Sequence, residues 1–156
     1  MSEANQANDD AIARTLRELL LSTRTNRSIV WKFVDDHLEV VYELVEKNPP
    51  CFAGTKLSDQ ESSVVVIEIF SRLGKLFKDE LFCIDFENDP GLAGEAGILS
   101  SLIELGNVQS SLIAILRRGG KLWGFLELQQ VGSKRQFTEQ DKLAVQQVLP
   151  KLGIQL

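Results

Sequence analysis

The stretch that decides the fold reads Val108-Gln-Ser-Ser-Leu-Ile-Ala-Ile-Leu-Arg-Arg-Gly-Gly-Lys-Leu-Trp-Gly-Phe-Leu-Glu-Leu-Gln-Gln130 and continues through a polar loop to Thr138-Glu-Gln-Asp141. Two apolar segments, 108–118 and 121–130, flank the pair Gly119-Gly120, which is typical of a tight β-hairpin turn. Thr138, followed three positions later by an acidic residue, indicates the N-cap of a helix that we expect over 138–149. The stretch therefore predicts a hairpin followed by a helix.

The rest of the chain adds further helices and strands. We expect a helix from Asn8 or Asp9 to about Thr23, strands over 28–34, 38–45 and 81–85, and a short helix over 96–105 that ends at Gly106. Ser58 begins another helical signal, although the β-branched run 64–67 also fits a strand. This order predicts an α+β fold with a central antiparallel sheet and N- and C-terminal helices packed on one face. Residues 1–8 are expected to be a disordered lead and residues 9–156 a single domain.

Composition excludes several classes of function. The chain has 156 residues, of which 44% are apolar and 25% charged, as is usual for one globular domain. A net charge of −5 with scattered basic residues argues against a nucleic-acid surface. No apolar run is long enough to span a membrane, and the polar N-terminus does not resemble a secretory signal, so we expect a cytoplasmic location.

Histidine and cysteine, which often carry catalysis or bind metals, are scarce in this chain. His37 is the only histidine, and it follows Asp35 and Asp36 in an expected hairpin turn. One histidine cannot form a typical zinc site, and the glycines at 91, 94 and 97 are not followed by the Lys-Ser or Lys-Thr of a phosphate-binding loop. The two cysteines, Cys51 and Cys83, form no Cys-x-x-Cys motif and cannot make a disulfide framework. The sequence thus predicts no enzyme and no metal site.

Alternation along two strands indicates a cavity. Trp123, Phe125, Glu127 and Gln129 should share one face of their strand, with Leu122, Gly124, Leu126 and Leu128 on the face under the helices. Aromatic walls with a few polar groups suit a small ligand. Two alternatives remain open: Glu127 and Gln129 could face solvent on an open sheet, and Trp31 and Trp123 could be ordinary core residues.

These patterns resemble a GAF domain of the PAS/GAF superfamily over roughly residues 9–156. The resemblance rests on Ile29-Val-Trp-Lys-Phe33, on Glu39-Val-Val-Tyr-Glu43 and on Phe137 followed by Asp141. The runs Leu122-Trp-Gly124 and Lys134-Arg-Gln-Phe137 look most like the GAF domains of phytochromes and cyanobacteriochromes. The resemblance implies a sensory or regulatory module in signal transduction.

The same resemblance implies that no bilin is attached covalently. The Cys-His pair that serves the bilin in those families falls here on Ile98 and Leu99, and their second histidine falls on Gln129. We therefore expect no covalent cofactor, while a noncovalent ligand remains open. The expected ligand-pocket residues are Trp31, Phe33, Cys83, Trp123, Phe125, Glu127 and Gln129.

The expected function is that of a non-catalytic sensory or regulatory module that dimerises or binds a signalling partner. GAF domains commonly pair through their first and last helices, and the interface residues expected here are Ile12, Leu16, Leu19, Leu20, Val148 and Leu152. Alternatively, these stripes simply cover their own sheet, and Pro150 should kink or stop the last helix. Two other functions remain: a noncovalent small-molecule sensor, and a free methionine sulfoxide reductase, whose local cysteine motifs this chain lacks.

Overall fold

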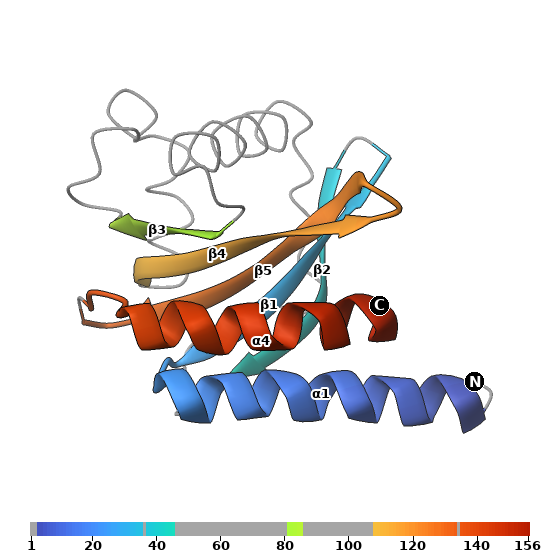
Figure 1. The fold of residues 1–156 in the computed structure, drawn as a ribbon, viewed down its shortest axis with the longest axis horizontal. Coiled ribbons are helices and arrows are strands. Elements are labelled where there is room, and N and C mark those ends of the chain that lie inside the picture. The colour runs from blue at the N-terminus through green and yellow to red at the C-terminus, as the bar shows by residue number, and fades with distance from the viewer. Residues whose placement is uncertain (1–2, 36, 46–80, 86–107, 134) are drawn as a thin grey trace.

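The structure of the protein is a computed structural model that describes residues 3–35, 37–45, 81–85, 108–133 and 135–156. In these residues an antiparallel sheet carries two helices side by side on one face (Figure 1). The elements are α1 (Glu3–Thr23), β1 (Arg27–Val34), β2 (His37–Val45), β3 (Leu81–Asp85), β4 (Val108–Arg118), β5 (Lys121–Val131) and α4 (Glu139–Gln155). The α+β class expected from the sequence is confirmed, as are the terminal helices that pack together over the sheet.

The sheet places the first strand and the last strand of the chain next to each other. The strands lie in the order β2-β1-β5-β4-β3, and every pair is antiparallel. Gly119 and Gly120 join β4 to β5, and their φ angles of 59° and 77° suit a tight two-residue hairpin turn. Strand β5 therefore lies at the centre of the sheet between β1 and β4, and the side chains of β1 and β5 meet directly.

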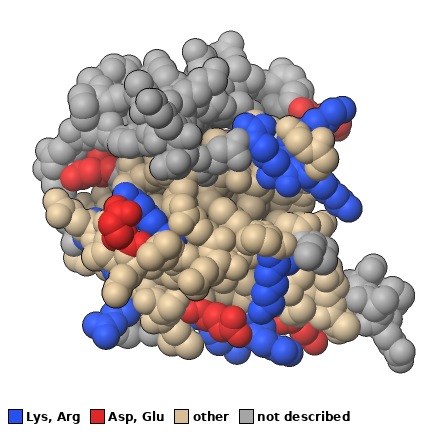
Figure 2. Space-filling view, in the orientation of Figure 1, with Lys and Arg blue, Asp and Glu red and all other residues tan. Residues whose placement is uncertain are grey.

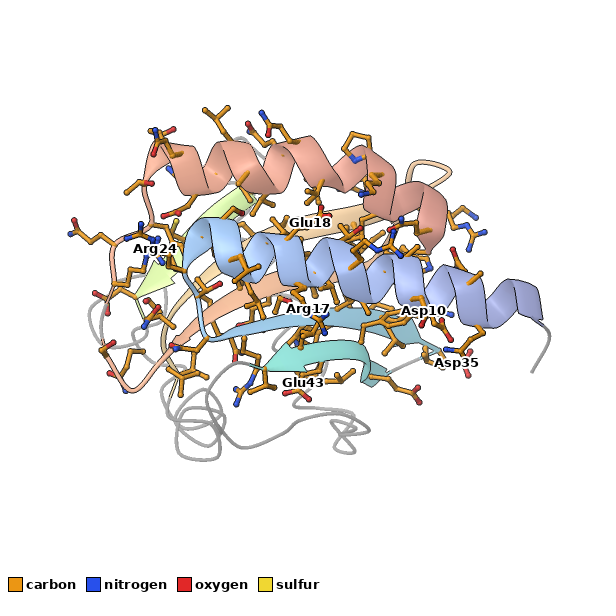
Figure 3. The ribbon with its side chains drawn as sticks, turned by 90° about the horizontal axis from the view of Figure 1, so that it is seen from below. Asp10, Arg17, Glu18, Arg24, Asp35 and Glu43 are labelled. Carbon is orange, nitrogen blue, oxygen red and sulfur yellow. The ribbon has the colours of Figure 1, made fainter. Side chains whose placement is uncertain are left out.

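The main apolar core lies between the sheet and the two helices. The sheet contributes Val30, Leu112, Leu126 and Leu128, each at most 1% exposed, and the helices contribute Ile12, Leu16, Leu19, Val145 and Leu152. Burial of each such aliphatic side chain is worth about 1.5–3 kcal/mol, so this cluster stabilises the helix layer. Figure 3 shows α1 and α4 side by side over the sheet, with Glu18 at their seam, where Lys151 Nζ lies 3.9 Å from Glu18 Oε2.

Helix α1 begins earlier than the sequence suggested. Residues 3–8 are helical and are not a disordered lead, and neither Asn8 nor Asp9 is the N-cap. Both residues hold the first turns of α1 against other elements, because Asn8 Nδ2 donates to the Gln155 carbonyl at 2.6 Å and Asp9 Oδ1 accepts from the Tyr42 hydroxyl at 2.8 Å. Tertiary contacts thus extend the helix beyond its local sequence signal.

Helix α4 continues past Pro150 to Gln155, so the expected stop at this proline is wrong. A proline inside a helix removes one backbone hydrogen bond. Here the residues that follow compensate, because Leu152 is fully buried in the core and Leu156 packs against it. The turn before β2 is also tighter than expected, since His37 already pairs with Val34.

A polar clasp joins the start of α4 to the end of α1. Thr138 caps α4: its hydroxyl accepts from the Asp141 backbone N–H at 3.2 Å, and Asp141 Oδ2 accepts from the Thr138 N–H at 2.8 Å. Arg135 Nη2 donates to both Asp141 oxygens at 2.9 Å, while Nη1 donates to the main-chain carbonyl of Thr23. The clasp fixes how the two helices lie relative to each other at this end.

Charges on the visible surface are mixed. Figure 2 shows basic and acidic side chains in small groups on this face, without one extended basic field. Neither of the helices in the described part of the chain combines the length and hydropathy that a membrane-spanning helix requires.

The helices expected after Ser58 and over 96–105 lie outside the described residues, as do Cys51, Ile98 and Leu99.

Candidate functional site

The face of the sheet opposite the helices carries a buried set of polar and aromatic side chains. Directly paired residues of antiparallel strands point to the same face. Across β1 and β5 the register pairs Arg27 with Gln129, Ile29 with Glu127 and Trp31 with Phe125, and β4 adds Ser111 opposite Gln129. We therefore take this face, with its three central strands, as the candidate site.

Glu127 is the centre of the site. Its side chain is 4% exposed, and each carboxylate oxygen accepts one hydrogen bond from a neighbouring strand. Trp31 Nε1 donates to Oε2 at 2.9 Å from β1, and Ser111 Oγ donates to Oε1 at 2.7 Å from β4. Hydrogen bonds to a charged group are stronger than neutral ones, so this carboxylate ties the three central strands together.

A second buried pair lies beside the first. Arg27 Nη1 donates to Gln129 Oε1 at 2.7 Å, and Arg27 Nε lies 3.2 Å from Glu43 Oε1 on β2. The Arg27 and Glu43 side chains are 0% and 1% exposed, so both charges are desolvated. Removing one partner of such a buried pair typically costs about 3–5 kcal/mol, because the other charge is left uncompensated.

Aromatic rings complete the described part of this face. Phe33 and Phe125 meet edge to face, with ring centroids 5.1 Å apart and an interplanar angle of 75°. Phe125 is fully buried and Trp31 is 7% exposed. The site is therefore an aromatic and polar surface inside the protein rather than an open, solvated sheet face, and Glu127 and Gln129 are buried.

Five of the residues expected in the ligand pocket share this face: Trp31, Phe33, Phe125, Glu127 and Gln129. Sequence reasoning missed Arg27, Glu43 and Ser111. Glu43 lies within the strand expected over 38–45, so its two-residue period would have placed it on a face. Arg27 lies just before the strand expected over 28–34, because β1 begins one residue earlier than the sequence suggested. The ion pair between Arg27 and Glu43 depends on β1 lying beside β2, and this strand order cannot be read from the sequence.

The other two expected pocket residues, Cys83 and Trp123, lie on the helix side of the sheet. Trp123 packs against the helix-side core, and Lys32 Nζ lies 5.6 Å from the centre of its ring. The reason is a β-bulge: Leu116 pairs with Gly124 and Arg117 with Leu122, so Trp123 is the extra residue and the alternation breaks there. Cys83 pairs with Leu112 and also packs against the helix-side core.

Burial raises the pKa of the Cys83 thiol above its ordinary value. Lys142 acts in the opposite direction, and the carboxylates of Asp141 and Glu139 raise the pKa further. A thiol with a raised pKa is a poor nucleophile at neutral pH. Within the described residues no group of three His, Cys, Asp or Glu side chains is placed to hold a metal ion.

The residues expected at a dimer interface are mostly internal. Ile12, Leu16 and Leu19 are at most 1% exposed, Leu20 is 4% exposed and Leu152 is fully buried, while Val148 packs partly buried against the same core. These side chains cover their own sheet, which was the alternative interpretation. Of these residues only Val148 keeps part of its surface exposed, so a contact between copies of the chain would rest largely on other residues.

Comparison with known families gives the fold its name. Residues 8–156 match the GAF domain family, which is nearly the whole chain, and the protein belongs to this family of sensory and regulatory domains. A comparison with curated proteins found no match.

Several solved structures are similar. A far-red cyanobacteriochrome photoreceptor is 19% identical with a TM-score of 0.68, over 91% of this chain and 81% of its own. The blue-light absorbing form of the Thermosynechococcus elongatus PixJ GAF domain is 15% identical with a TM-score of 0.68, over 99% and 84%. The chromophore-binding domain of the R. palustris bacteriophytochrome RpBphP3 is 14% identical with a TM-score of 0.71, over 95% and 55%. At these identities the likeness shows the fold alone, and at that level the resemblance found in the sequence is confirmed.

Proposed function

We propose that this GAF domain is a non-catalytic sensory or regulatory module of a cytoplasmic signalling protein. It carries no covalently attached bilin and acts through contacts with a second copy or with a partner protein. The observation that supports this proposal is the state of Glu127, whose two carboxylate oxygens are both engaged by Trp31 and Ser111 from the neighbouring strands. The Glu127 carboxylate therefore serves to hold the neighbouring strands together.

This arrangement is unfavourable for catalysis. A general base must reach the proton that it removes, within about 2.6–3.2 Å. Glu127 is instead held by two donors of the protein itself and is buried. Cys83 lies on the helix side and its thiol pKa is raised by burial, which argues against the thiol chemistry of a methionine sulfoxide reductase.

Coexpression with bilin-synthesising enzymes tests the absence of a covalent chromophore. We expect colourless protein, because Ile98 and Leu99 stand where the resemblance places the reactive cysteine and the histidine. A bilin-binding GAF domain of a cyanobacteriochrome, expressed in the same cells, is the positive control. An adduct that absorbs visible light and survives denaturation would overturn the proposal.

A second candidate, a noncovalent small-molecule sensor, is favoured by the aromatic pair Phe33–Phe125 beside the polar groups of Glu127 and Gln129. Aromatic walls with a few fixed polar groups are what ligand sites require. Native mass spectrometry of freshly purified protein separates the two candidates. The regulatory module should show only the mass of the polypeptide or its oligomer, whereas a sensor should retain a compound or gain thermal stability when one is added.

A further inference from the structure

A hollow of about 190 Å³ lies between helix α4 and strand β3, on the helix side of the sheet. Strand β3 lines it with Leu81 and Phe82, which are 7% and 1% exposed, and with Cys83. Helix α4 lines it with Leu143 and with the polar residues Glu139, Lys142 and Gln146. The hollow thus combines Leu81, Cys83 and Leu143 with polar side chains of the helix.

Leu143 is exposed at the rim of this hollow. Its exposed fraction is 53%, and among the described residues only one other large apolar side chain, Leu21 at 67%, is classed as exposed. A single exposed leucine needs no explanation by itself. Leu143 itself lines the hollow between α4 and β3, so this exposed leucine lies directly beside a recess in the surface.

The hollow has room for an apolar side chain. A protein cavity of roughly 150 Å³ lined by apolar groups takes up a benzene molecule. A hollow of about 190 Å³ can therefore receive a leucine side chain. An apolar knob that stands next to a hollow of matching size makes this surface complementary to itself.

Charges on the rim also suit a second copy. Glu139 and Lys142 are three residues apart on α4, and their charged atoms lie 2.8 Å from each other. The Glu139 side chain is 84% exposed and that of Lys142 34%. When two such rims meet about a two-fold axis, Glu139 of one copy can approach the partner's Lys142, so that unlike charges meet and like charges are not forced together.

We propose that Leu143 and this hollow form a two-fold contact between two copies of the chain, with Leu143 of each copy seated in the hollow of the other. Because the knob borders its own hollow, the same patch of both copies can form the contact, which is then isologous and closes at the dimer. A contact between two different patches would instead form rings or open filaments. The inference rests on the proposed function, in which the domain acts through contacts with a second copy or a partner. It assigns the contact to the α4–β3 surface and not to the buried leucines of the helix stripes.

Sedimentation of the whole chain over a range of concentrations tests the contact. The parent should dimerise, Leu143→Glu should weaken the dimer at least tenfold, and Leu21→Glu should leave it unchanged. Leu21→Glu is the matched control because it makes the same change at the other exposed leucine. A parent that stays monomeric, a Leu143→Glu variant that dimerises like the parent, or two variants with equal effects would each overturn the proposal.

A charge swap gives a second test that leaves the apolar groups in place. Glu139→Lys should weaken the dimer, because it sets a lysine against the partner's Lys142. The double variant Glu139→Lys with Lys142→Glu should restore it, since unlike charges meet again. If the double variant is as weak as the single one, the two-fold pairing is wrong.

Labelling of Cys83 reports the hollow directly, because the thiol lines it. A maleimide should react more slowly with Cys83 as the parent concentration rises, and no such protection should appear in Leu143→Glu. Protection at every concentration, together with a monomeric parent, would mean that another molecule fills the hollow and would overturn the two-fold contact. The coexpression with bilin-synthesising enzymes tests the proposed function separately, so the failure of one is distinguishable from the failure of the other.

Discussion

Gly124 lies against the main-chain carbonyl of Trp31, so closely that a Cβ atom at this position would overlap the carbonyl oxygen. Gly124 pairs with Lys32 on β1 and with Leu116 on β4, next to the bulged residue Trp123. The atoms in the way belong to the β1 backbone, which cannot yield as a flexible side chain could. This glycine therefore sets the spacing of β1 and β5, and with it the place of the Trp31 indole over Glu127.

Gly124→Ala should destabilise the protein by about 1–3 kcal/mol or more, the usual cost of overpacking a close-packed interior. Gly153→Ala is the control, because nothing lies within 4 Å of its added Cβ and the residue is inside helix α4. There alanine should be neutral or stabilising by up to about 1 kcal/mol. Urea unfolding of both variants measures the difference, and equal stabilities would show that the close approach is not as described.

The Glu127 carboxylate should be energetically coupled to Trp31. Trp31→Phe and Ser111→Ala each remove one of its two donors and should each cost about 1–3 kcal/mol, because a buried acceptor is left unsatisfied. In a double-mutant cycle Trp31→Phe and Glu127→Leu should couple by about 0.5–3 kcal/mol. Trp123→Phe makes the same change on the helix side and should show no coupling to Glu127. Equal coupling for both tryptophans would contradict the site.

The sequence predicted those parts of the fold whose signals are local. The hairpin turn at Gly119-Gly120 needs positive φ angles, and the cap at Thr138 needs only a residue three positions later, so both could be recognised from neighbouring residues. The full length of α1 could not, because its first turns depend on contacts between Asn8 and Gln155 and between Asp9 and Tyr42. Such contacts join segments far apart in the chain.

The candidate site shows the same division. Simple alternation placed Phe125, Glu127 and Gln129 on one face, and the structure keeps them there. It failed at Trp123, because one bulged residue reverses the face of everything beyond it. Alternation also could not predict the ion pair between Arg27 and Glu43, because that pair forms only when β1 lies beside β2 in this register.

Thr138 should contribute to stability as the N-cap of α4. Thr138→Ala should cost about 0.5–2 kcal/mol, because the backbone N–H of Asp141 loses its acceptor. Thr138→Ser keeps the hydroxyl and should retain most of the stability. Thermal unfolding of the two variants measures this difference. A serine variant as unstable as the alanine variant would mean that the methyl group, and not the cap, is what matters.

Tyr42 offers a direct test of how the start of α1 docks on the sheet. Burial and, after it, the hydrogen bond and charge of Asp9 raise the pKa of Tyr42 from 10.0 to about 12. Because the folded protein holds the phenol proton more tightly than the unfolded chain does, this contribution to stability is complete below pH 10. It is lost as the pH rises toward about 12. The chain contains one tyrosine, so the absorbance of tyrosinate reports this residue alone.

Replacement of Asp9 should lower that pKa. Asp9→Asn removes the negative charge, so the titration midpoint should fall toward 10.0 without reaching it, since burial still disfavours the phenolate. Asp10→Asn is the matched control, because Asp10 accepts its hydrogen bond from Gln6 on the same helix. It changes the net charge by the same amount and should leave the Tyr42 midpoint in place. Equal shifts in the two variants would attribute the raised pKa to the overall charge of the helix. A shift confined to Asp9→Asn would show that the first turns of α1 rest on β2 in solution.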